Sequence, residues 1–193
     1  MSELKCIVTQ DTSWKRALNE ARRTVGKEPL DKEPSRKWKL KSLIAEHSQI
    51  KLVEYTIMFE NLRQWVGVHL LRHLFVLPFI HSQREDRRVL DVPRDELPQG
   101  SLNDQDFVVN AQTLINVSRK RLCNCASKET REAWGLVKER IHEIDPEMAD
   151  VMVPNCIYRG FCPEVKSCGW YKTEAYLKQL EAYRSLNKEE DGQ

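Results

Sequence analysis

Residues 72–84 read RHLFVLPFIHSQR, and this stretch says more about the chain than any other. Arg72 and His73 follow the apolar run 65–71, so both side chains leave the end of a packed element. After residues 75–81, the triplet Ser82-Gln83-Arg84 adds a second polar group. Arginines form forked, charge-assisted hydrogen bonds with phosphate, and histidine and serine supply donors of shorter reach. The stretch therefore predicts a site for an anionic ligand.

The spacing of this motif resembles that of the flavin-dependent thymidylate synthases, the ThyX family. Members of that family carry Arg-His-Arg, seven residues, and then Ser-x-Arg. This chain matches every fixed position except the second arginine, which is Leu74. An isolated Arg-His pair more often marks a solvated helix end or an ion pair, so the surrounding sequence decides between the two interpretations.

The surrounding sequence also resembles the family. The segment Ala45-Glu46-His47-Ser48 precedes a strand-like run and a helix that ends at Arg72, which is the family's order of histidine, strand, helix and Arg-His. His47 lies the same distance before Arg72 as in family members. Downstream, Asn116 takes the place of the family's flavin-contacting asparagine. The resemblance runs from His47 to the helix around Trp134, nearly half of the chain.

The resemblance implies an α+β fold, with helices packed on a mainly antiparallel sheet, and a homotetramer whose active sites lie between subunits. It implies reductive methylation of dUMP at carbon 5. Methylenetetrahydrofolate would supply the one-carbon unit, and reduced FAD, itself reduced by NADPH, would supply the hydride. The implied partners are thus dUMP and a folate.

Site roles follow from the same resemblance. The residues that match flavin contacts are His47, Arg72, His73 and Asn116, and those that match contacts to the nucleotide phosphate are Ser82, Gln83 and Arg84. The family activates the pyrimidine without a cysteine nucleophile, so no cysteine receives a catalytic role.

One further family residue is an arginine near the C-terminus that binds and polarises the uracil. An ungapped comparison from Asn116 places Ser127 at that position. Arg131 lies one helical turn later and reaches the same region, so it is the first candidate for the cation, and Arg121 is the second. The alternative for Arg131 is a surface ion pair with a carboxylate such as Glu129, Glu132 or Asp145.

Departures from the motif fall on ligand positions. Leu74 replaces an arginine, and Phe79 and Ile80 stand where many members have an asparagine and an acidic residue. Two alternatives to a thymidylate synthase follow. One is a nucleotide-binding homologue without catalysis, and the other is a related flavin- and folate-dependent enzyme that adds another one-carbon group at carbon 5, for example a hydroxymethyl group.

Composition is consistent with a single domain over residues 1–193. With 40% hydrophobic and 31% charged residues, the chain is long enough to bury a sizeable core. A net charge of +2 is too small for a surface that binds a nucleic-acid polymer, so we expect a single nucleotide as ligand. No apolar run approaches the roughly 20 residues that span a bilayer, and Met1–Lys5 lacks the apolar core of a signal peptide. We expect no membrane contact and a cytoplasmic location.

Five of the six cysteines cluster late in the chain. Cys156, Cys162 and Cys168 are separated by five intervening residues each, a wide spacing for a zinc knuckle. Cys123 and Cys125 fall in a predicted helix, where residues two apart do not face each other. We therefore predict reduced, buried thiols and no metal site, with zinc as the alternative.

Local patterns predict the elements in outline. Apolar spacing predicts helices over 14–25, 38–46, 61–73 and 103–122, another that starts after Ser127, and a last one over 171–186. A β-branched and aromatic run predicts a strand over 50–59, and Pro78 predicts a loop or irregular extended piece over 74–81. We further expect a surface loop over 86–100 and a frayed tail over 188–193.

Overall fold

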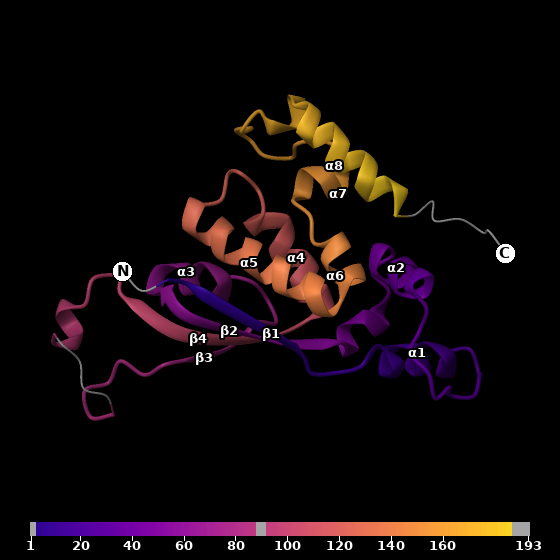
Figure 1. The fold of residues 1–193 in the computed structure, drawn as a ribbon, viewed down its shortest axis with the longest axis horizontal. Helices are drawn as coiled ribbons and strands as arrows, with labels where there is room; N and C mark the ends of the chain where they lie inside the picture. Colours follow the sequence, from indigo (N-terminus) through magenta and orange to yellow (C-terminus); the bar gives the residue numbers. More distant parts are fainter. Residues whose placement is uncertain (1–2, 88–91, 187–193) are drawn as a thin grey trace.

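The computed structural model describes residues 3–87 and 92–186, so the tail predicted at 188–193 and part of the loop predicted at 86–100 lie outside the described residues. A four-stranded antiparallel sheet, in the order β1-β2-β4-β3, forms one layer, and helices lie above it (Figure 1). The strands are β1 (Lys5–Gln10), β2 (Glu54–Arg63), β3 (Leu77–Ile80) and β4 (Leu102–Asn110). The predicted α+β class, with helices on an antiparallel sheet, is confirmed.

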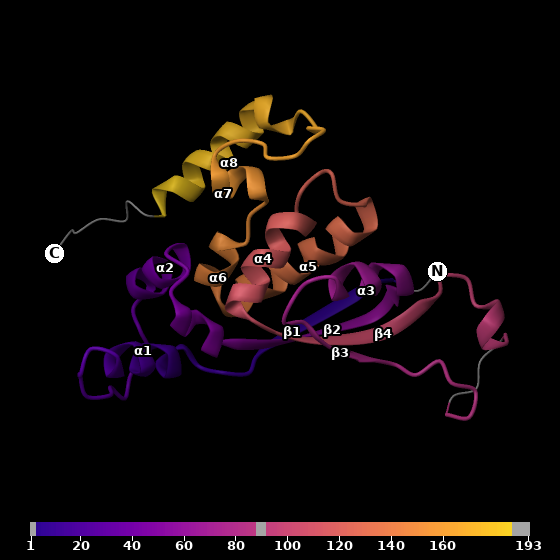
Figure 2. The ribbon, with the colours of Figure 1, turned by 180° about the vertical axis from the view of Figure 1, so that it is seen from behind.

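Eight α-helices accompany the sheet in the described residues. They are α1 (Trp14–Arg23), α2 (Arg36–Ile44), α3 (Gln64–Leu71), α4 (Ala111–Arg121), α5 (Lys128–Ile144), α6 (Pro146–Val151), α7 (Asn155–Arg159) and α8 (Glu174–Ser185). Short 3₁₀ helices cover Ser48–Leu52, Arg94–Glu96 and Trp170–Lys172. Figure 2 shows α7 and α8 above α4–α6, on the side away from the sheet. None of the described helices is long and apolar enough to cross a membrane.

The core lies between the sheet and the helices above it. Alternate residues of β2 and β4 are buried, and Phe59 and Phe107 meet edge to face with their ring centroids 6.1 Å apart. From the helices, Leu114 on α4 and Trp134 and Val137 on α5 join the same apolar cluster. This packing holds α3, α4 and α5 in fixed positions over one face of the sheet.

The prediction of a helix over 103–122 was wrong for its first half. Residues 102–110 form β4, in which Asn103, Gln105, Phe107 and Val109 are buried in strict alternation. The helix begins only at Ala111, because the Asn110 side chain accepts a hydrogen bond from the backbone N–H of Thr113 and caps it.

The prediction of a loop over 74–81 was also wrong in part, because Leu77–Ile80 forms β3 at the edge of the sheet, antiparallel to β4. Pro78 fits there, since an edge strand does not need every N–H for pairing. Cys123 and Cys125 were placed in a helix in error: α4 ends at Arg121, and both cysteines lie in the turn before α5.

Other boundaries differ less. The strand predicted over 50–59 runs from Glu54 to Arg63, and the helix predicted over 61–73 is the shorter α3. The helix predicted to start after Ser127 is confirmed: Ser127 is the N-cap residue of α5, although its side chain makes no capping hydrogen bond and donates to the Thr130 hydroxyl. Strand β1 and helices α6 and α7 were not predicted.

Helix α3 approaches the sheet most closely at Gly67. A Cβ atom added to Gly67 would lie 1.8 Å from Oε1 of Gln105, a fully buried residue of β4. The Gln105 side chain is fully buried, so a larger residue at position 67 must displace its amide within the core or push α3 away from β4. Glycine is therefore required here by close packing.

We predict that Gly67→Ala lowers the free energy of unfolding by about 1 to 3 kcal/mol, the usual cost of overpacking a core. Gly135→Ala is the matched control: it lies in α5 with nothing within 4 Å of the added Cβ, and should stabilise the protein by up to about 1 kcal/mol through helix propensity. Urea unfolding of both variants measures the difference. Equal stabilities for the two variants would contradict the close-packing argument.

Candidate functional site

The C-terminal end of α3 carries the predicted Arg72-His73 pair and is joined to α4 by Arg121. Nε of Arg121 donates to Nε2 of His73 at 2.9 Å, and NH2 donates to the His69 carbonyl at 2.6 Å. The last carbonyls of a helix have no partner within the helix and carry partial negative charge, so a guanidinium stabilises this end. Arg72, the C-cap residue of α3, is exposed beside it.

His73 is held in its neutral form. Burial first, and then the positive charges of Arg121 and Lys120, together lower the pKa of its imidazole to about 4. Because Nε2 accepts the hydrogen bond from Arg121, the proton of the neutral ring resides on Nδ1. At neutral pH, therefore, His73 offers an uncharged donor next to two arginines.

A second histidine, which the sequence reasoning missed, extends this cluster to α5. His69 lies one turn before His73, and its Nδ1 is 3.0 Å from the hydroxyl of buried Thr130. That hydroxyl also accepts a hydrogen bond from Ser127 at 2.7 Å. Burial, then Arg121 and Arg72, lower the pKa of His69. The available signal was its spacing, since two histidines four residues apart share one face of a helix.

The two arginines proposed from the resemblance to face a uracil differ in their contacts. Arg121 has its Nε and NH2 groups bound to His73 and to α3. Arg131, in the first turn of α5, makes one long hydrogen bond, 3.4 Å from NH1 to the Asn124 carbonyl. Within the described residues it forms no ion pair with the carboxylates considered as alternatives, and Asp145 is buried against other partners. Arg131 thus keeps a cationic side chain available next to the cluster.

Along α4, a second group of polar residues surrounds Asn116. Arg119 forms an ion pair with Glu46, and Gln112 donates to Glu46 at 2.6 Å. The exposed Asn116 accepts long contacts from Gln112 and Arg119, at 3.4 and 3.5 Å. Burial opposes ionisation of Glu46, but hydrogen bonds from Arg119 and Gln112 outweigh it and lower the pKa of its carboxyl.

The predicted flavin contacts therefore do not form one group: Arg72 and His73 lie at the end of α3, whereas Asn116 lies on the exposed face of α4. Asn116 lies between Glu46, near the start of the helix, and Arg121 with His73 at its end; from residue 112 to 121 the helix rises about 13 Å. His47 follows Glu46 but is exposed and lines a different hollow, of about 560 Å³, with Arg16, Glu20 and Thr24. Of the four predicted contacts, the structure brings Arg72 and His73 together at the end of α3, whereas Asn116 lies beside Arg119 on α4 and His47 lines the separate hollow.

Ser82, Gln83 and Arg84 lie at the far end of β3. Leu77, where β3 starts, pairs with Val108, and Ile80, where it ends, pairs with Gln105. Arg72 and His73 precede the first end, whereas Ser82 follows the second, so the strand separates the two halves of the motif. Arg84 donates to Asp86 at 2.8 and 2.6 Å, and its backbone N–H donates to the Ser82 hydroxyl at 3.2 Å.

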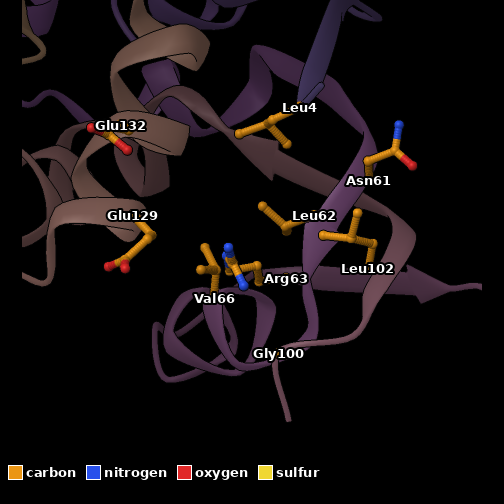
Figure 3. A pocket seen from close by; sticks show the side chains of 9 residues that line it. All are labelled: Leu4, Asn61, Leu62, Arg63, Val66, Gly100, Leu102, Glu129 and Glu132. Carbon is orange, nitrogen blue, oxygen red and sulfur yellow. The ribbon is translucent and has the colours of Figure 1, made fainter. Parts of the chain in front are cut away.

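A hollow of about 440 Å³ near the other end of the sheet is a poor alternative site for an anion. Figure 3 shows Glu129 and Glu132 of α5 on one side of it and Arg63 and Val66 on the other. None of the predicted site residues lines it. Its two carboxylates would repel a phosphate, whereas the cluster at the end of α3 is cationic.

We compared the sequence and the fold with those of known proteins. No protein-family model matches the sequence, and no curated protein matches it. Among solved structures, the chain is similar to a UMP/dUMP methylase, PolB, from Streptomyces cacaoi bound with 5-Br dUMP, with a TM-score of 0.65 over 83% of this chain and 96% of that one, at 12% identity. It is also similar to thymidylate synthase X (ThyX) from Helicobacter pylori with FAD and dUMP, with a TM-score of 0.61 over 77% and 97% of the two chains, at 14% identity. The chain has the ThyX fold.

We predict that His73 stays neutral down to about pH 5 and titrates with a pKa near 4. Replacing Arg121 with Gln removes one cause of the shift and should move the pKa upward, toward the ordinary histidine value of about 6.5. Because the folded pKa lies below the unfolded one, the stability linked to His73 is complete above about pH 6.5 and is lost as the pH falls toward 4.

NMR titration of the imidazole resonances measures this pKa in the parent and in both variants. Arg131→Gln is the control, since Arg131 is not among the groups that shift His73. A parent pKa near 6.5 would show that the contact between Arg121 and His73 does not persist in solution.

Proposed function

We propose that the protein is a flavin-dependent enzyme that methylates dUMP at carbon 5. Methylenetetrahydrofolate would supply the one-carbon unit, and FAD, reduced by NADPH, would supply the hydride. The observation that carries the proposal is the cationic cluster of Arg72, His73 and Arg121 at the joined ends of α3 and α4. It occupies the motif position that resembles the family's, in a fold shared with a dUMP methylase and with a ThyX that holds FAD and dUMP.

The residues at the cluster suit a flavin dinucleotide. Arg72 is exposed at the helix end and fits a phosphate of the dinucleotide, because a guanidinium binds phosphate through paired N–H groups. Neutral His73 and the exposed amide of Asn116 supply uncharged hydrogen bonds of the kind that a flavin ring accepts. His47, assigned by resemblance, would contact the flavin from a neighbouring subunit, since it faces a separate hollow in its own chain.

The nucleotide phosphate is assigned to Ser82, Gln83 and Arg84. These residues lie at the opposite end of β3 from Arg72, and this separation supports a site that more than one subunit completes. The segment between them is apolar and open: Leu74, Phe75 and Phe79 are 81%, 76% and 63% exposed. Contiguous exposed apolar residues typically mark a protein interface. We therefore propose a homotetramer whose sites combine the two halves of the motif from different copies, which light scattering tests.

Arg131 is the proposed cation at the uracil. Negative charge develops on the ring when carbon 5 is activated, and a fixed positive group stabilises it. Arg121 already binds His73 and the α3 carbonyl, so its role is to hold the cluster in place. Arg131 makes only one long hydrogen bond and is placed on α5, which Thr130 ties to His69.

One observation favours a second candidate function. At Leu74 the motif has an exposed apolar side chain where the resemblance expects an arginine, which removes a charged ligand contact. A nucleotide-binding homologue without catalysis, or an enzyme that adds another one-carbon group such as hydroxymethyl, is compatible with that loss. The product formed from the nucleotide distinguishes these functions.

The direct test is a turnover assay with FAD, NADPH, methylenetetrahydrofolate and either dUMP or UMP, followed by mass spectrometry of the nucleotide. The proposal expects that dUMP gains a methyl group in place of the hydrogen on carbon 5. This product should form only when FAD, NADPH and methylenetetrahydrofolate are all present. A hydroxymethylated product would select the related enzyme, and tight dUMP binding without any product would select the non-catalytic homologue.

We predict that Arg84→Ala weakens dUMP binding by at least tenfold, because the bound phosphate would bury the contact with Arg84, and losing a buried charged contact costs about 2 to 5 kcal/mol. Arg23→Ala is the matched control, since Arg23 is likewise an exposed arginine next to a carboxylate, Glu20, but lies on α1. Calorimetry with dUMP measures both. Unchanged affinity in Arg84→Ala would remove Arg84 from the site.

We predict that Arg131→Lys lowers turnover of dUMP more than it lowers binding, because lysine keeps the charge but loses the planar fork of donors. Arg131→Ala should lower turnover further, about a hundredfold or more, as expected for loss of a group that stabilises developing charge. Steady-state kinetics separate the two effects. If Arg131→Ala retained the parent rate, Arg121 would become the residue to test.

A further inference from the structure

The last part of the described chain has little apolar core of its own. Helices α7 and α8 and the loop between them pack around the buried side chains of Val153, Cys156, Ile157, Tyr176 and Leu180, a cluster separate from the main core. In Figure 1, α8 lies at the outer edge of the molecule, farthest from the sheet. So few apolar side chains bury little surface, and small units of this kind usually depend on a disulfide or a metal ion.

Cysteines from three separate segments converge at this point. Cys123 comes from the turn between α4 and α5, Cys156 from α7, and Cys162 and Cys168 from the loop that follows α7. All four line one small, largely enclosed hollow of about 10 Å³, the size of a single water molecule or ion. Cys125 lies beside it, with its sulfur 3.7 Å from the Lys166 carbonyl in the same loop.

The loop between Gly160 and Gly169 is shaped to bring its cysteines inward. Both glycines have positive φ, of 78° and 81°, so each end of the loop turns sharply where other residues would be strained. Between them the chain has no helix or strand, and Cys162 and Cys168 both line the hollow, although Cys162 is only half-buried and Cys168 is exposed rather than buried as predicted. The turn before α5 is not helical either. The argument against a metal at Cys123, which assumed that Cys123 lies in a helix, therefore does not apply.

The thiols are protonated and crowded. Burial raises the pKa of Cys123 and of Cys156, and the pKa of Cys125 is raised to about 11 by desolvation and by the neighbouring thiols of Cys123 and Cys168. Ionising one thiol among several is unfavourable unless a positive charge compensates. None of the six cysteines forms a disulfide.

We propose that Cys123, Cys156, Cys162 and Cys168 bind a zinc ion in this hollow. Four thiolates match the tetrahedral coordination of structural zinc, and the hollow matches the size of one ion. Binding forms four Zn–S bonds and releases the four thiol protons to solvent. Among the described residues no three such side chains are already arranged around a metal, so binding requires the thiols to rearrange around the hollow.

The zinc site ties the α7–α8 segment to the turn that starts α5. Cys123 lies two residues after Arg121 and four before Ser127, so a metal bond at Cys123 would anchor the turn that joins α4 to α5. A disulfide would use two of the four thiols and leave the others unpaired around the same hollow. The inference stands on these contacts and does not depend on the proposed function.

The test is metal analysis of the full chain purified under reducing conditions, with Cys168→Ser and Cys162→Ser as variants and Cys6→Ala as control, because Cys6 lies on β1 away from the hollow. We expect about one zinc ion per chain in the parent and in Cys6→Ala, and loss of zinc in both serine variants. Zinc-stripped parent titrated with Co²⁺ should develop the sulfur-to-cobalt charge-transfer and tetrahedral visible bands, which gives a readout even where a variant fails to fold.

Absence of both bound zinc and the cobalt spectrum would overturn the proposal. It would also be overturned by iron with acid-labile sulfide, which indicates an iron–sulfur cluster, or by a disulfide among these cysteines found by mass spectrometry in metal-free protein. Unchanged zinc content in a folded Cys168→Ser variant would contradict the assigned ligand set.

Discussion

The contact of Arg121 with the end of α3 is the interaction on which the arrangement of the site depends. One guanidinium, from the last turn of α4, binds both the His69 carbonyl and the ring of His73, and so joins two helices that approach from different parts of the sheet. Its charge, together with burial, keeps His73 neutral. Through Thr130 the same contact network reaches the start of α5. A basic motif at a helix end thereby becomes a fixed cationic surface rather than a set of independent mobile side chains.

The sequence predicted the parts of this arrangement that local chemistry determines. Arg72 and His73 lie at a helix end, as their place after an apolar run indicated, and α5 starts after Ser127. Residues 103–110 were predicted wrongly as helix, because Phe107 and Val108 fit the apolar face of a helix as well as a strand. Only the pairing with β2 shows that this segment is a strand. Strand β3 was missed because Pro78 discourages a strand, except at an edge. The contacts of His69 and Arg121 join residues about fifty positions apart, and no local pattern contains them.

The separation of the motif's two halves by β3 has a structural consequence. Leu74 and Phe75, just before β3, and Phe79, within this edge strand, are exposed to solvent, which is the kind of surface that another chain covers. An edge strand flanked by basic groups at each end allows one copy to supply the end of α3 and another to supply Arg84. Cys123, in the turn after α4, lines the cysteine-lined hollow together with residues that follow α6. The start of α5 therefore contacts two distant parts of the chain, α3 through Thr130 and the region of α7 through this turn.

The central claim is that the end of α3, with Arg72, His73 and Arg121, holds a flavin next to a pyrimidine nucleotide. The most direct measurement is the visible absorption spectrum of the protein after reconstitution with FAD and gel filtration, recorded before and after addition of dUMP. The account predicts flavin that elutes with the protein and a spectrum that shifts when dUMP binds beside it. FAD recovered entirely in the small-molecule fraction, with no spectral response to dUMP, would contradict it.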